Sequence, residues 1–144
     1  MNKENIVVER TFNAPIEKVW SAITDKDEMK SWYFQLADFK PEVGFKFEFI
    51  GGPEGGIQYL HLCEITEVVE GKKLTYSWRY DGYPGNSFVT WELFDKGEQT
   101  LLRLTHSALE TFDQSHAGFE KSNFNEGWTY FMHTALKGYL EPEG

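Results

Sequence analysis

Residues 124–140 read FNEGWTYFMHTALKGYL, and the predicted architecture of the domain depends on this segment. Its apolar side chains recur at the spacing of one face of an α-helix, which predicts a helix with one buried stripe. At about 100° of rotation per residue, His133 and Lys137 fall well away from that stripe and are expected to face solvent. The stripe itself consists of Phe124, Trp128, Phe131, Met132, Ala135 and Tyr139. Such a stripe needs an apolar surface to cover it, and the rest of the chain must supply that surface.

Upstream of this helix the apolar residues recur every second position, which is typical of half-buried strands. Five such strands are expected, and their apolar faces carry Phe45, Phe47 and Phe49; Tyr59, His61, Cys63 and Ile65; Leu74, Tyr76, Trp78 and Tyr80; Val89, Trp91 and Leu93; and Leu102, Leu104 and His106. The second strand is expected to run from Ile57 to Val69, after a glycine-rich hairpin at residues 51–56. Residues 107–123 are polar and predict an irregular connection to the last helix.

The N-terminal part predicts one strand and two short helices. Ile6–Phe12 is a β-rich run, and Pro15 suits the first turn of the helix that follows. Asp25 and Glu28 have the spacing of a capping box, which would start a second helix carrying Met29 and Trp32. We therefore predict an α+β domain over residues 1–144, in which a curved six-stranded antiparallel sheet surrounds a long C-terminal helix, with two short helices after the first strand.

Composition narrows the possible partners and compartments. The 144 residues suffice for one domain with one core. The net charge of -9 repels phosphate backbones and anionic lipid, so neither nucleic acid nor a membrane is an expected partner. Cys63 is the one cysteine, which excludes an intramolecular disulfide. No signal-peptide core or membrane-length apolar run occurs, so we expect a cytoplasmic protein.

Several short motifs, in their order and spacing, carry a resemblance to a known family. They are Ala14–Trp20, Glu67–Leu74, Tyr76–Trp78, Leu104–Ser107, and Gly127-Trp128 together with Tyr139–Glu141. With them the chain resembles the START-like (SRPBCC) superfamily, in particular its branch similar to the activator of Hsp90 ATPase. The resemblance implies a helix-grip fold whose cavity, between sheet and C-terminal helix, binds apolar molecules or in some members catalyses cyclisation. Eukaryotic activators also carry a separate chaperone-binding domain that this sequence lacks, so a chaperone contact is a weaker expectation.

The inward sheet face and the last helix supply the candidate ligand-binding residues, which are Phe47, Tyr59, His61, Tyr76, Trp78, Trp91, His106, Trp128 and Met132. Two interpretations stay open, because these aromatic side chains could fill the interior completely or could line a pocket. The hydroxyl, imidazole and indole groups among them favour a pocket, since a few polar groups in an apolar cleft are typical of ligand sites. His61 and His106 could be proton shuttles or core histidines with satisfied ring nitrogens, and the second interpretation is favoured.

Other chemistry has little support. No metal-ligand spacing occurs, so neither a metal nor another cofactor is expected. Cys63 reads as a small buried hydrophobe, and Ser107 has no nucleophile motif around it. The leading hypothesis is therefore binding of a small hydrophobic, ring-containing or lipid-like molecule. A cyclase or aromatase acting in the same cavity, or a chaperone co-factor acting through its surface, are the alternatives.

Overall fold

The computed structural model describes residues 5–33, 38–51, 58–112 and 121–141. In chain order the elements are β1 (Ile6–Phe12), α1 (Ile16–Thr24), α2 (Lys26–Trp32), β2 (Lys46–Gly51), β3 (Tyr59–Val69), β4 (Lys73–Tyr80), β5 (Ser87–Lys96), β6 (Gln99–Ser107), the 3-10 turn η1 (Leu109–Thr111), α3 (Lys121–Tyr130), the π-helical turn η3 (Phe131–Ala135) and α4 (Leu136–Leu140). The predicted order of one strand, two short helices, further strands and a C-terminal helix is confirmed.

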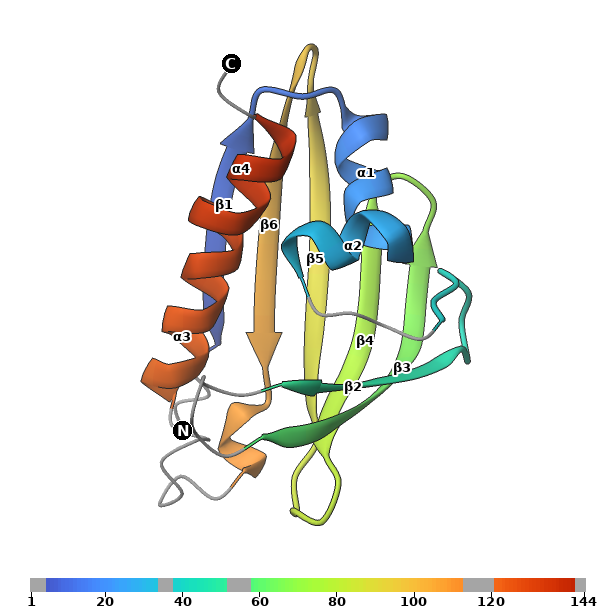
Figure 1. Ribbon diagram of the computed structural model, residues 1–144, viewed down its shortest axis with the longest axis vertical. Coiled ribbons are helices and arrows are strands. Elements are labelled where there is room, and N and C mark those ends of the chain that lie inside the picture. The colour runs from blue at the N-terminus through green and yellow to red at the C-terminus, as the bar shows by residue number, and fades with distance from the viewer. Residues whose placement is uncertain (1–4, 34–37, 52–57, 113–120, 142–144) are drawn as a thin grey trace.

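The six strands form one antiparallel sheet in the order β1-β6-β5-β4-β3-β2. Because β1 pairs with β6, the first and last strands of the chain meet, and β1 and β2 are left as the two edges. The sheet curves, and α1, α2 and the C-terminal helix all lie on its one concave side (Figure 1). This arrangement confirms the predicted fold class, and it places the core between the sheet and these helices.

The start of each short helix follows the sequence closely. Pro15 caps α1, and its carbonyl accepts hydrogen bonds from the amides of Lys18 and Val19. The Asp25 carboxylate accepts from the amides of Asp27 and Glu28 and so caps α2, as predicted. The second half of the expected capping box is wrong, however. Glu28 accepts hydrogen bonds from the Ser21 and Tyr139 hydroxyls, because α4 packs beside α2 and offers a partner there.

The C-terminal helix contains a π-helical turn in its middle. At Leu136 the backbone N–H donates to the carbonyl of Phe131, five residues back. The buried side chains then recur every fourth residue, at Phe124, Trp128, Met132, Leu136 and Leu140. In an ideal α-helix that spacing would drift by about 40° at each step. The wider π turn takes up this drift and buries Leu136 and Leu140 fully, while Ala135 and Tyr139, which the helical period assigns to the stripe, pack against the core as partly buried residues.

His133 corrects a second expectation about this helix. It is half-buried, and its Nδ1 accepts a hydrogen bond of 3.0 Å from Nη1 of Arg10. Arg10 lies at an inward-facing position of β1, between Val8 and Phe12, and its long side chain reaches the flank of the helix. The prediction that His133 faces solvent was wrong. The helical period describes only the helix itself, so it cannot show that the Arg10 side chain of the edge strand β1 covers His133.

The strands and the last connection differ from expectation in smaller ways. β3 contains a β-bulge between Ile65 and Glu67, and Phe45 precedes β2 as a partly buried residue. The expected hairpin at 51–56 lies, apart from Gly51 in β2, outside the described residues, as does the predicted strand residue Ile57. The connection predicted to be irregular and polar contains η1, whose first residue Leu109 is a buried core residue, as is Phe112 directly after the turn. It ends earlier than predicted, because α3 begins at Lys121.

Candidate functional site

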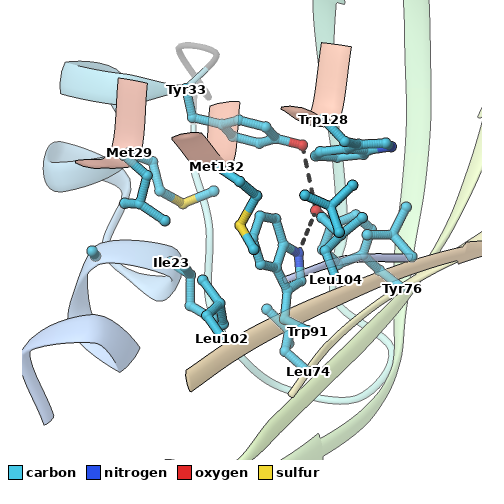
Figure 2. Packing of buried hydrophobic residues seen from close by; sticks show 14 of the residues in the cluster. Ile23, Met29, Tyr33, Leu74, Tyr76, Trp91, Leu102, Leu104, Trp128 and Met132 are labelled. Carbon is cyan, nitrogen blue, oxygen red and sulfur yellow. Dashed lines mark hydrogen bonds between the residues drawn. The ribbon is translucent and has the colours of Figure 1, made fainter. Parts of the chain in front are cut away.

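Trp128 lies at the centre of the interior between sheet and helix. It is 3% exposed, and its ring lies 5.4 Å from that of Trp78, 5.8 Å from Trp91 and 5.9 Å from His106, measured between centroids. These three partners come from β4, β5 and β6 and point toward the helix because they occupy the inward positions of their strands. Met132, one turn further along the helix, points from the helix toward the sheet (Figure 2). The structure thus brings together the predicted residues of the sheet centre.

A chain of hydrogen bonds runs from the helix through His106 to the backbone of β4. The Trp128 indole N–H donates to Nδ1 of His106 at 2.9 Å, and Nε2 of His106 lies 2.8 Å from Oγ of Ser87. The Ser87 hydroxyl donates to the carbonyl of Trp78 at 2.8 Å. Because an indole can only donate, Nδ1 must be the accepting nitrogen, and the proton of the neutral ring sits on Nε2. His106 therefore donates to Ser87, and every polar atom in the chain has a partner.

This tautomer argues against nucleophilic catalysis by Ser87. A serine nucleophile needs an unprotonated imidazole nitrogen to take its proton, and here the facing nitrogen carries one. If the imidazole proton moved from Nε2 to Nδ1, two N–H groups would face each other, that of His106 and that of Trp128, and their hydrogen bond would be lost. Burial also lowers the pKa of His106 to about 3, so the ring is a weak base as well as a misdirected one. Ser87 and His106 have the spacing of a catalytic dyad, but their hydrogen bonds link the C-terminal helix to the sheet.

A second hydrogen-bonded chain joins Trp91, Tyr76 and Tyr33. The Trp91 indole N–H donates to the Tyr76 hydroxyl at 3.1 Å, and the hydroxyls of Tyr76 and Tyr33 lie 3.4 Å apart (Figure 2). All three side chains are buried. Burial raises the pKa of both tyrosines, so the hydroxyls stay protonated at neutral pH.

Sequence reasoning did not single out Tyr33. Its ring lies between the sheet and the C-terminal helix, 6.2 Å from Trp128 at an interplanar angle of 21° and 5.0 Å from Phe131 at 67°. A signal was available, since Met29, Trp32 and Tyr33 stand at i, i+3 and i+4 and so share one helix face. Tyr33 directly follows the helix but continues its apolar stripe into the interior.

The remaining predicted residues lie in a neighbouring aromatic group toward the β2 edge. His61 stacks on Phe49 with centroids 4.5 Å apart, and its Nδ1 lies 3.0 Å from the carbonyl oxygen of Tyr59. Burial lowers the pKa of His61 to about 4, against a smaller opposing effect of that carbonyl. Phe47 contacts Tyr76 at 5.1 Å and joins the two groups. The Tyr59 side chain is only half-buried and packs on Tyr80 and Tyr83, so it lies at a rim and not beside Trp128.

The outer face of the sheet carries a separate groove of about 300 Å³ across β2, β3 and β4. Its lining is mostly polar and of mixed charge, namely Lys46, Phe47, Glu48, Leu62, Cys63, Glu64, Ser77 and Arg79. Of the predicted ligand residues it includes Phe47 alone. Within the described ranges, no three His, Cys, Asp or Glu side chains come close enough to hold a metal ion. Among the described helices, none is long and apolar enough to cross a membrane.

A curved antiparallel sheet closed by a C-terminal helix, with an aromatic interior between them, defines a START-like protein of the helix-grip class. Comparison with known proteins specifies the branch. The sequence profile of the family described as Activator of Hsp90 ATPase homolog 1-like protein matches residues 13–141, and the chain belongs to this family.

Known relatives agree with this assignment. The Hsp90 co-chaperone AHA1 of Saccharomyces cerevisiae is 24% identical over an alignment of 133 positions, which covers 87% of this chain but only 35% of that protein. The chain thus spans about a third of the length of this curated relative. Among solved structures, CalU16 from Micromonospora echinospora is 27% identical with a TM-score of 0.74, covering 96% of this chain and 76% of CalU16. Protein MLL2253 from Mesorhizobium loti is 28% identical with a TM-score of 0.77, and the match covers 98% of this chain and 99% of MLL2253.

Proposed function

We propose that this protein binds a small, apolar, ring-containing molecule between its sheet and its C-terminal helix. The observation that carries the proposal is the combination of aromatic walls with two internal hydrogen-bond chains, one through His106 and one through Tyr76. Apolar surroundings with a few convergent polar groups are typical of sites that hold and orient small molecules. Membership of the family and the shared fold of the solved relatives are consistent with a ligand-binding or cyclase-like module.

The charge state of the interior favours a neutral ligand. Burial lowers the pKa of His61 to about 4 and of His106 to about 3, and it raises the pKa of Tyr76 and of Cys63. At neutral pH these inward groups are therefore uncharged, and an ionic ligand would lose its hydration without gaining a counter-charge from them. Burial of a few hundred Å² of apolar ligand surface, at about 25 cal/mol per Å², is compatible with roughly micromolar affinity once the entropy cost of association is included.

Tryptophan fluorescence provides the test, because Trp78, Trp91 and Trp128 all lie in the interior. We expect saturable quenching by polyketide-like, flavonoid-like or fatty-acid probes. Ala135→Phe, on the inner flank of η3, should weaken binding, because Ala135 packs against the core. Thr134→Phe is the matched control, since Thr134 is the exposed neighbour in the same turn. If no probe quenches the wild type, or if both variants bind equally well, the interior is not the functional site.

The match to the yeast co-chaperone supports a second candidate, contact with an Hsp90-type chaperone. The likeness covers 35% of that protein, so its activity is carried to this chain only as a proposal. Isothermal titration of the chain against an Hsp90-type chaperone, with and without ATP, tests it. Binding that Ala135→Phe leaves unchanged would indicate an outer surface, and it would favour this candidate over ligand binding.

A further inference from the structure

The interior side chain of Tyr33 belongs neither to the sheet nor to the C-terminal helix. It comes from the residue that ends α2, where the backbone turns extended, at φ −130° and ψ −160°. We propose that Tyr33 occupies the ligand site as a resident phenol, and that the ligand is a hydroxylated aromatic compound whose ring and hydroxyl take the place of those of Tyr33. This inference rests on the function proposed above and adds to it the chemical class of the ligand and the side chain that it displaces.

The surroundings of Tyr33 make the contacts that a free phenol would need. Trp128 lies nearly parallel to its ring at 6.2 Å, Phe131 meets it edge-on at 5.0 Å, and Phe49 lies at 6.0 Å. Offset-stacked and edge-on arrangements at these distances are favourable for aromatic rings. The Tyr76 hydroxyl, which already accepts from Trp91, lies opposite the phenolic oxygen. A free phenol would find the same walls and the same polar partner.

Tyr33 is anchored differently from the tryptophans around it. Trp78 and Trp91 belong to central strands, and their positions are fixed by backbone pairing on both sides. Trp32, one residue before Tyr33, is held by a hydrogen bond of 2.9 Å from its indole to the carbonyl of Ala22. Tyr33 lies at a helix end, and its 3.4 Å contact with Tyr76 is longer than the usual 2.5–3.0 Å of hydroxyl pairs. Rotation about its χ1 angle would vacate the site without breaking a sheet hydrogen bond.

The same geometry selects the neutral form of the ligand. Burial raises the pKa of Tyr33 and of Tyr76, so the site disfavours a phenolate. A phenol that ionises near neutral pH, such as 4-nitrophenol, should bind at pH 6 and lose affinity above its own pKa. p-Cresol, which stays neutral through pH 8, should bind equally well across that range.

The first experiment vacates the site by substitution. By isothermal titration, Tyr33→Ala should bind p-cresol roughly tenfold or more tightly than the wild type, because the competing side chain is gone. Tyr33→Ala should also bind p-cresol more tightly than toluene. Adding Tyr76→Phe to Tyr33→Ala should reduce this ratio of affinities by roughly three- to tenfold, which corresponds to the loss of one hydrogen bond. Phe12→Ala is the control, since it opens a cavity at a fully buried position of β1 that should not distinguish the two compounds. Equal affinity of Tyr33→Ala for p-cresol and toluene would overturn the inference.

The second experiment uses the intact protein, so it decides the matter even where Tyr33→Ala fails to fold. The chain is labelled with 3-fluorotyrosine, and the ¹⁹F resonance of Tyr33 is assigned by its loss in Tyr33→Phe. On saturation with p-cresol this resonance should move to the position of an exposed tyrosine. If apolar probes quench the tryptophans of the wild type while the Tyr33 resonance stays in place, ligand binding stands and the displacement of Tyr33 is wrong. If p-cresol, raised to its solubility limit, neither quenches the tryptophans nor shifts the Tyr33 resonance of the wild type, the displacement of Tyr33 is wrong as well.

Discussion

The indole N–H of Trp128 donates to Nδ1 of His106 across 2.9 Å, and neither side chain is more than 3% exposed. This hydrogen bond joins the C-terminal helix to β6 inside the core. Because the indole is a donor only, it fixes the tautomer of His106 and thereby makes the imidazole a donor to Ser87. A single side chain on the helix thus decides what a histidine on the sheet can do.

Replacing Trp128 should destabilise the fold strongly. Trp128→Ala removes a buried ring at the centre of the interior, and a loss of about 3–5 kcal/mol in the free energy of unfolding is expected. Trp128→Phe keeps most of the ring but leaves Nδ1 of His106 without its donor, so it should cost less. Urea unfolding measures both. A loss below about 1 kcal/mol for Trp128→Ala would mean that the helix does not pack as described.

Ser87 should behave as a structural residue. Ser87→Ala leaves the Nε2–H of His106 without an acceptor in a buried place, which should cost about 1–3 kcal/mol. A fluorophosphonate reagent should not label Ser87 in the folded protein. Ser107→Ala, at a half-buried strand end, is the matched control and should change stability by no more than about 0.5 kcal/mol. Labelling of Ser87 would contradict the assigned tautomer.

Stability should fall on mild acidification because two buried histidines resist protonation. The pKa of His61 is about 4 and that of His106 about 3 in the folded protein, against about 6.5 in the unfolded chain. The unfolded state therefore takes up these protons first. The stabilisation from the neutral rings is complete above about pH 6.5, and it is lost toward pH 4 at about 1.4 kcal/mol per pH unit for each histidine.

His61→Phe isolates one of these contributions. The variant keeps an aromatic ring against Phe49 and removes one titrating group, so its unfolding free energy should depend less steeply on pH. Urea unfolding of the wild type and of His61→Phe between pH 7 and 5 measures the difference in their unfolding free energies. The carboxylates are the same in both proteins, so their contribution to the pH dependence cancels in this difference. Parallel curves for the two proteins would show that His61 titrates normally in the folded state.

Tyr139 should hold α4 against α2 through Glu28. Its hydroxyl donates to Oε1 of Glu28 at 2.9 Å, and a hydrogen bond to a charged acceptor is worth about 1.5–3 kcal/mol. Because the site is partly open to water, we expect Tyr139→Phe to cost about 1 kcal/mol, which is below that range and within the range for neutral hydrogen bonds. Tyr130→Phe, on the exposed side of the helix at 57% exposure, serves as the control. Equal stability of the two variants in urea would show that this link contributes nothing.

The elements and their order could be predicted from local sequence patterns. The change of apolar period from 3.6 to 2 and back is a local property, and each element must bury the face that its own residues make apolar. The Asp25 cap is local in the same way, because the carboxylate meets amides two and three residues further on. For the same reason the burial of Trp128 could be predicted from its place in the helical stripe.

Contacts between residues far apart in the chain depend on how the elements pack, and the sequence pattern did not predict them. Arg10 and His133 are 123 residues apart in the sequence, and Glu28 and Tyr139 are 111 residues apart. No local sequence pattern therefore predicts either contact. The π turn in the last helix brings Leu136 and Leu140 inward, away from the face that an ideal period assigns to the core. Tyr33 enters the interior because α2 ends beside Trp128, and that placement depends on how two helices pack on one curved sheet.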